Sequence, residues 1–140
     1  MKVLLDYKFT NLNTYINTCR TNKFMANKIK QQETEYARLM FRNVPKYEKP
    51  IELTFTWHIK NVCSDLDGKL PKNIIDGLVK AKKIPDDNVK YIRKIIHIYQ
   101  KDAKDFVEVE IKEMGLLEEI EKVEQFLNEE EVDLIKEDTN

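Results

Sequence analysis

The chain has 140 residues, of which 41% are hydrophobic and 35% are charged, a composition that excludes a disordered chain and fits a single globular domain. No apolar run approaches the ~18 residues of a membrane-spanning helix, and Asp6 comes before the apolar core of a signal peptide could form. Cys19 and Cys63 form neither a CxxC motif nor a zinc-binding pattern. We therefore expect a cytoplasmic protein with reduced thiols.

The charge is divided unevenly along the chain. Residues 1–114 contain 22 lysines and arginines against 15 acids, a net charge of +7, whereas residues 115–140 contain 2 against 10, a net charge of −8. A basic body suits a polyanion such as nucleic acid, although lysines that only solvate a surface give the same count. The sequence thus divides into a body of residues 1–114 and an acidic tail of residues 115–140.

The first half of the chain predicts a strand, a helix and a second strand. The first strand is expected over Val3–Phe9. A helix follows over Phe24–Asn43, where the residues at helical spacing include Glu33 among apolar and aromatic side chains. Ile51–Ile59 alternates strictly between apolar and polar residues and is the strongest strand signal in the chain.

The second half predicts one further helix and two further strands. The helix is expected over Leu70–Lys83, with Pro71 near its start, where proline is tolerated. Strands follow over Val89–Tyr99 and Phe106–Ile111. The resulting order, β-α-β-α-β-β, predicts an α+β domain with a small mixed or antiparallel sheet and two helices. In the acidic tail, a C-terminal amphipathic helix is expected from Leu116, Ile120, Val123 and Leu127.

A polar stretch after the strongest strand carries the candidate chemistry. Asp65 and Asp67 are two positions apart, so in an extended chain both carboxylates project to one side, with Cα atoms roughly 6.5 Å apart. The next helix follows with Lys72 in its first turn, and Asp86 and Asp87 come after that helix. Such residues suit phosphodiester cleavage, because Mg²⁺ prefers oxygen ligands and a lysine can stabilise transition-state charge.

The same residues have other interpretations. An EF-hand loop beginning at Asp65 would require an acid where Lys69 stands and a glycine where Leu70 stands, so a calcium loop is excluded. Asp65 can also act only as the cap of the following helix. Asp86–Asn88, after a proline, is an ordinary turn composition. The capping and turn interpretations stay open beside the metal site.

Three segments together resemble the signature of the RusA family of Holliday junction resolvases, small endonucleases common in phages and prophages. They are Asp65–Asp67, Lys72–Leu78 and Ile84–Asp87. The resemblance covers residues 60–95 and is compatible with the body up to Met114. It implies a homodimer that uses Mg²⁺, or Mn²⁺ in its place, to resolve four-way DNA junctions by paired symmetric nicks in recombination and repair. It also implies that Asp65, Asp67 and Asp87 bind the metal, with Asp86 as the next candidate acid. The catalytic lysine that it implies is Lys72.

The chain departs from the family pattern at two places. The turn Phe9–Asn13 keeps an asparagine but lacks the usual prolines, and Gly68 stands where the family often has asparagine. A loop is expected over Thr18–Lys23, where basic residues can contact the DNA backbone or simply be solvated. The candidate DNA contacts are Asn13, Arg20, Lys23, Lys28 and Lys69.

Two alternative functions remain beside junction resolution. One is a DNA-binding or regulatory protein that has kept the fold without catalytic turnover. The other is a metal-dependent nuclease acting on another branched DNA. Of the remaining residues, Trp57 is expected in the core, and Cys63 is expected to be a small buried side chain rather than a nucleophile, because no His-Asn or His-Asp arrangement accompanies it.

Overall fold

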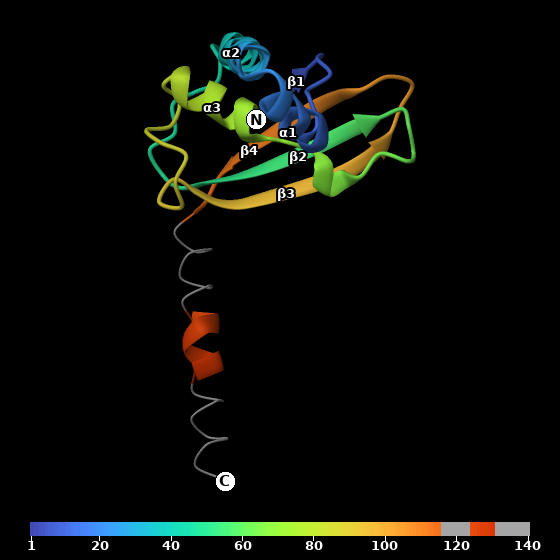
Figure 1. Ribbon diagram of the computed structural model, residues 1–140. Helices are drawn as coiled ribbons and strands as arrows, with labels where there is room; N and C mark the ends of the chain where they lie inside the picture. Colours follow the sequence, from blue (N-terminus) through green and yellow to red (C-terminus); the bar gives the residue numbers. More distant parts are fainter. Residues whose placement is uncertain (116–123, 131–140) are drawn as a thin grey trace.

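The computed structural model describes residues 1–115 and 124–130, and it confirms an α+β fold (Figure 1). Residues 124–130 are helical. Leu116, Ile120 and Val123 of the expected tail helix lie outside the described residues. The elements of the body, in chain order, are β1 (Lys2–Leu5), α1 (Leu12–Thr21), α2 (Lys23–Met40), β2 (Ile51–Ile59), the short 3₁₀ helix η1 (Leu66–Gly68), α3 (Lys72–Lys80), β3 (Ile92–Lys101) and β4 (Phe106–Glu113).

The four strands form one mixed sheet in the order β1-β4-β2-β3. β2 and β3 are parallel, whereas β4 pairs antiparallel with both β1 and β2. Parallel neighbours need a crossover connection, and here the chain makes it through η1 and α3. The three helices α1, α2 and α3 lie on the same side of the sheet (Figure 1). The crossover therefore places the polar stretch after β2 and the residues after α3 around one helix.

The alternation of β2 sets the position of the core. Every second residue from Ile51 to Ile59 is buried, and the residues between them are half-buried. Trp57 is 4% exposed, as expected for a core residue. Val107, Val109 and Ile111 of β4 extend the same apolar face, which packs with Ile74 and Leu78 of α3 and with Ala37 and Phe41 from α2 and its C-terminal end.

The packing of α2 against α3 depends on a glycine and a buried acid. A Cβ atom on Gly77 would lie 2.4 Å from the Cβ of Ala37, so only glycine allows this approach. Glu33 of α2 is 1% exposed. Its carboxylate accepts hydrogen bonds from the backbone N–H of Thr10 at 2.7 Å and from Asn73 Nδ2 of α3 at 2.7 Å. These contacts fix the start of α3 against α2 and the loop after β1.

The structure differs from several of the sequence expectations. A helix, α1, occupies Leu12–Thr21, where most of the segment expected to be a loop lies. Apolar and aromatic residues do recur at helical spacing in this helix, but none of them is buried; they are Leu12, Tyr15, Ile16 and Cys19. Asn11 caps the start of α1, and Asn22 follows its end and caps α2. β1 ends at Leu5 rather than continuing to Phe9. Cys63 is exposed, so the expectation of a buried side chain is wrong, because it lies in the loop beyond the end of β2.

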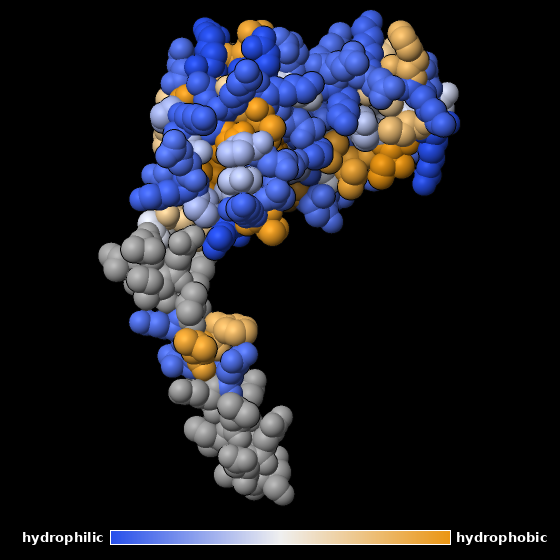
Figure 2. Space-filling model, turned by 90° about the vertical axis from the view of Figure 1, so that its left-hand side faces the viewer, coloured by the Kyte–Doolittle hydropathy of each residue, from blue (hydrophilic) through white to orange (hydrophobic). Residues whose placement is uncertain are grey.

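The surface is largely polar. The face shown in Figure 2 is mostly hydrophilic, with separate apolar areas between the charged side chains. In the described part of the tail, Phe126 and Leu127 are 60% and 51% exposed. Among the described residues, no helix is both long and apolar enough to cross a membrane.

Candidate functional site

Lys72 is the first residue of α3 and the centre of the site. Pro71 precedes it with φ −80°, an angle that proline favours and that continues into the helix. The Lys72 ammonium donates hydrogen bonds to Asp87 Oδ2 at 2.5 Å and to Asp76 Oδ1 at 2.9 Å. Its side chain remains 55% exposed. A lysine is thus held by two carboxylates while still open to a ligand.

The charges of this cluster stabilise one another. The hydrogen bond from Lys72 holds the pKa of the Asp87 carboxyl below its usual value. The hydrogen bonds to Asp87 and then to Asp76 raise the pKa of the Lys72 ammonium. At neutral pH the lysine is therefore fully protonated and Asp87 is fully ionised. The cluster presents a fixed cation beside two anions.

Asp86 and Asp87 have different environments despite being neighbours. Asp86 Oδ1 accepts a hydrogen bond from the backbone N–H of Asp87 at 2.8 Å, and Asp86 Oδ2 accepts one from Asn88 Nδ2 at 3.1 Å. These are the contacts of a turn-forming aspartate. The turn interpretation therefore applies to Asp86, and the contact with Lys72 belongs to Asp87.

Asp65 and Asp67 lie at the start of η1, and both are exposed. The side chain of Asp65 makes no capping hydrogen bond, although its carbonyl accepts the backbone N–H of Gly68 at 3.2 Å. Within residues 1–115 and 124–130, no group of three or more Asp, Glu, His or Cys side chains is arranged to hold a metal ion together. The structure thus brings Asp87 to Lys72 and does not gather Asp65 and Asp67 with Asp87.

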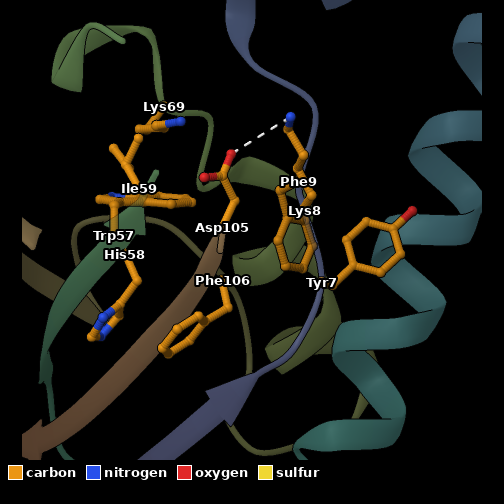
Figure 3. Close-up of a pocket in the computed structure, with 9 residues that line it drawn as sticks. All are labelled: Tyr7, Lys8, Phe9, Trp57, His58, Ile59, Lys69, Asp105 and Phe106. Atoms are coloured by element: carbon orange, nitrogen blue, oxygen red, sulfur yellow. Dashed lines mark ion pairs between the residues drawn. The ribbon is translucent and has the colours of Figure 1, made fainter. Parts of the chain in front are cut away.

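The candidate DNA contacts come from two parts of the chain. Asn13 and Arg20 belong to α1, and Lys23 and Lys28 to α2, and all four are exposed. Lys69 instead follows η1 and lines a small pocket at the end of the sheet (Figure 3). The pocket is shared with Tyr7, Lys8, Phe9, Trp57, His58, Ile59, Asp105 and Phe106.

Sequence reasoning gave no role to two residues that organise the site. Asp76 holds the Lys72 ammonium, and the spacing of four positions within a helix is the signal that indicates such a pair. Glu33 fixes Asn73, the residue after Lys72. The sequence indicates this role of Glu33 because an acid stands at a position of the helix where the other residues at the same spacing are apolar or aromatic.

Comparison with known proteins leaves the family open. No protein-family model matches the chain, and no curated protein matches it. The assignment of a function therefore depends on the residues of the site and on the motif that they form.

Proposed function

We propose that the chain is a Mg²⁺-dependent, structure-selective endonuclease that resolves four-way DNA junctions by paired symmetric nicks, as the resemblance to the RusA family implies. The observation that supports this proposal is the contact between Lys72 and Asp87. These two residues come from two separate segments of the motif, and the fold brings them within hydrogen-bonding distance. The proposed roles are in DNA recombination and repair in the cytoplasm.

The role of Lys72 in this proposal is electrostatic. Phosphodiester cleavage places additional negative charge on the phosphoryl oxygens and on the leaving oxygen, and a protonated lysine stabilises that charge. Asp87 and Asp76 hold the ammonium at the start of α3 and raise its pKa, so it stays protonated throughout the reaction. Because the side chain is half exposed, a phosphate can reach it.

Asp65 and Asp67 would hold the metal ion. Mg²⁺ in proteins is typically bound by one or two carboxylates, several waters and phosphate groups of the substrate. Two exposed carboxylates in one short turn fit this donor chemistry, and a third protein ligand is not required. When bound, the ion supplies an activated water and neutralises charge on the phosphate.

A homodimer follows from the shape of the substrate. A four-way junction is close to two-fold symmetric, so a dimer with a two-fold axis can present equivalent sites to opposing strands. The net charge of +7 of the body suits a polyanionic substrate of this kind.

A second candidate is a DNA-binding protein of the same fold without turnover. The separation of Asp65 and Asp67 from Asp87 favours this alternative, because the described residues do not form a complete three-acid centre. A nuclease that cuts another branched DNA is distinguished from a junction resolvase only by its substrate.

One assay separates these candidates. The full chain and its Asp67→Asn variant are each incubated with a labelled four-way junction, a three-way junction and a linear duplex, with Mg²⁺ or with EDTA. Symmetric nicking of the four-way junction by the parent with Mg²⁺, lost in Asp67→Asn, is the expected result. Equal binding by both proteins without nicking by the parent would overturn the catalytic proposal. Preferential cutting of the three-way junction would overturn the assignment of the four-way junction as the substrate.

A further inference from the structure

A basic groove lies at the end of the sheet where β2 ends and the chain turns from β3 to β4. Its volume is about 510 Å³. We call it the sheet-end groove; the side chains that line it come from the segment after β1, the end of β2 and the β3–β4 turn. They are Lys8, Lys60, Asn61, Ala103, Lys104 and Asp105.

The charge of the sheet-end groove is positive. Its one acid, Asp105, has both carboxylate oxygens engaged: Oδ1 accepts the backbone N–H of Lys60 at 2.8 Å, and Oδ2 lies 3.6 Å from Lys8 Nζ. Lys104 pairs with Asp6 at 3.0 Å, but both side chains are more than half exposed, so the pair is weak and screened by salt. The Lys60 ammonium forms no ion pair with any described residue. With Asp6 included, the three lysines therefore meet two acids, and the groove keeps a net positive charge.

The groove is continuous with the segment that carries Asp65 and Asp67. Lys8 and Asp105 also line the small neighbouring pocket, into which Lys69 projects (Figure 3). Lys69 directly follows η1, which contains Asp67. The lysines that line the groove and the neighbouring pocket thus extend from the β3–β4 turn to Lys69, which is two positions after Asp67 in the sequence.

We propose that the sheet-end groove binds consecutive phosphates of the DNA strand that leads to Asp65 and Asp67. An open groove with several separate lysines fits an extended polyanion better than a small enclosed ligand, because each ammonium can neutralise one phosphate. This inference rests on the proposed function, and it places strand contact at the sheet end rather than on α1 and α2. It adds Lys8, Lys60 and Lys104 to the DNA-binding surface.

The test compares two double variants of the full chain. Lys60→Gln/Lys104→Gln changes the sheet-end groove, whereas Lys46→Gln/Lys49→Gln changes exposed lysines that precede β2 and so lie at the opposite end of the same strand. Binding to a labelled four-way junction is measured by fluorescence anisotropy in EDTA over a range of NaCl concentrations. Thermal melting establishes that each variant is folded.

The salt dependence gives the expected result. The slope of log K against log[salt] is expected to become shallower by about 0.9 for each lysine that neutralises a phosphate, hence by about 1.8 in the groove variant. The control variant should keep the slope of the parent. Should the groove variant fail to fold, the single variant Lys60→Gln serves, because the Lys60 ammonium has no ion pair to lose within residues 1–115 and 124–130.

The outcomes separate this inference from the proposed function. Equal slopes for the parent and the groove variant would overturn DNA binding by the sheet-end groove, even if the parent nicks junctions. The parent can also bind junctions without nicking them. A shallower slope in the groove variant would then support DNA binding by the groove and overturn the proposed endonuclease activity. A parent that does not bind DNA overturns both.

Discussion

Lys72 and Asp87 are 15 residues apart in the sequence, yet their side chains meet at 2.5 Å. The rest of α3 lies between them in the chain, so the segment after α3 must return alongside the first turn of that helix. Asp76 completes the contact from within the helix. The start of α3 and the turn before β3 are therefore coupled, and a change at either side chain alters the charge that the other one meets.

The first prediction distinguishes the two neighbouring aspartates before β3. Asp87→Asn should lower junction nicking by about 100-fold, the scale of a displaced catalytic group, because it removes the acid that orients Lys72. Asp86→Asn should keep most of the activity, since Asp86 only holds its own turn. Single-turnover nicking rates of both variants give the comparison. A greater loss of nicking in Asp86→Asn than in Asp87→Asn would show that Asp86, and not Asp87, supports the reaction.

How far the sequence predicts this fold can be judged from three segments. β2 is predicted to the residue, because its alternation follows directly from one buried and one partly solvated face. α1 is missed although Leu12, Tyr15, Ile16 and Cys19 recur at helical spacing, because that stripe is short and the Asn and Thr residues around it are typical of a loop. The segment expected as Val89–Tyr99 forms β3 slightly later, since its first residues belong to the turn after Asp87.

The candidate site was predictable in composition but not in arrangement. The motif identifies Lys72 and Asp87, and the crossover through α3 explains why they lie close together. Their separation from Asp65 depends on the path of residues 60–71, which no periodicity determines. The role of Glu33 requires knowledge of which side chains of α3 face α2. Sequence patterns indicate most of the elements, whereas loop paths decide which acids meet.

The second prediction concerns the pH range of the Lys72–Asp87 pair. The pKa of Asp87 is lower in the folded protein, so the pair contributes stability above the unfolded value of about 3.9 and loses it as the pH falls through the folded pKa. The pKa of Lys72 is raised, so its contribution is complete below about 10.4 and is lost as the pH rises through the folded value. Both contributions are present at neutral pH.

A double-mutant cycle measures this pair. Lys72→Met, Asp87→Asn and the double variant should give a coupling free energy of roughly 0.5 kcal/mol at pH 7, because both side chains are partly exposed. Urea unfolding at pH 7 and at a series of pH values below about 3.9 supplies the values, and the coupling should decrease only well below about 3.9, as the pH falls through the lowered pKa of Asp87. A coupling that decreases already at or above about 3.9 would contradict the lowered pKa of Asp87.

The third prediction concerns the buried carboxylate of α2. Glu33→Ala should destabilise the protein by about 3 kcal/mol, because one buried and one part-buried hydrogen bond to the carboxyl group are lost and the donors on Thr10 and Asn73 remain unpaired. The matched control on the same helix is Glu35→Ala, whose exposed pair with Arg38 should contribute little to the free energy of unfolding, because solvent screens it. Urea unfolding compares the two. Similar losses in both variants would show that Glu33 is not part of the core contact.

The fourth prediction concerns the approach of α2 to α3 at Gly77. Gly77→Ala places a Cβ 2.4 Å from the Cβ of Ala37 and 2.8 Å from the backbone nitrogen of Arg38, so the helices must separate. The expected destabilisation is about 2 kcal/mol, in the range of overpacked cores. Gly68→Ala is the control, because its nearest neighbour, the Cβ of Asp65, lies at 4.0 Å and its backbone needs no glycine. The midpoint of thermal unfolding should fall in the first variant and stay near that of the parent in the second. Since Lys72 lies on the same helix, Gly77→Ala should also slow nicking, and normal stability together with normal nicking would contradict close packing as the constraint on α3.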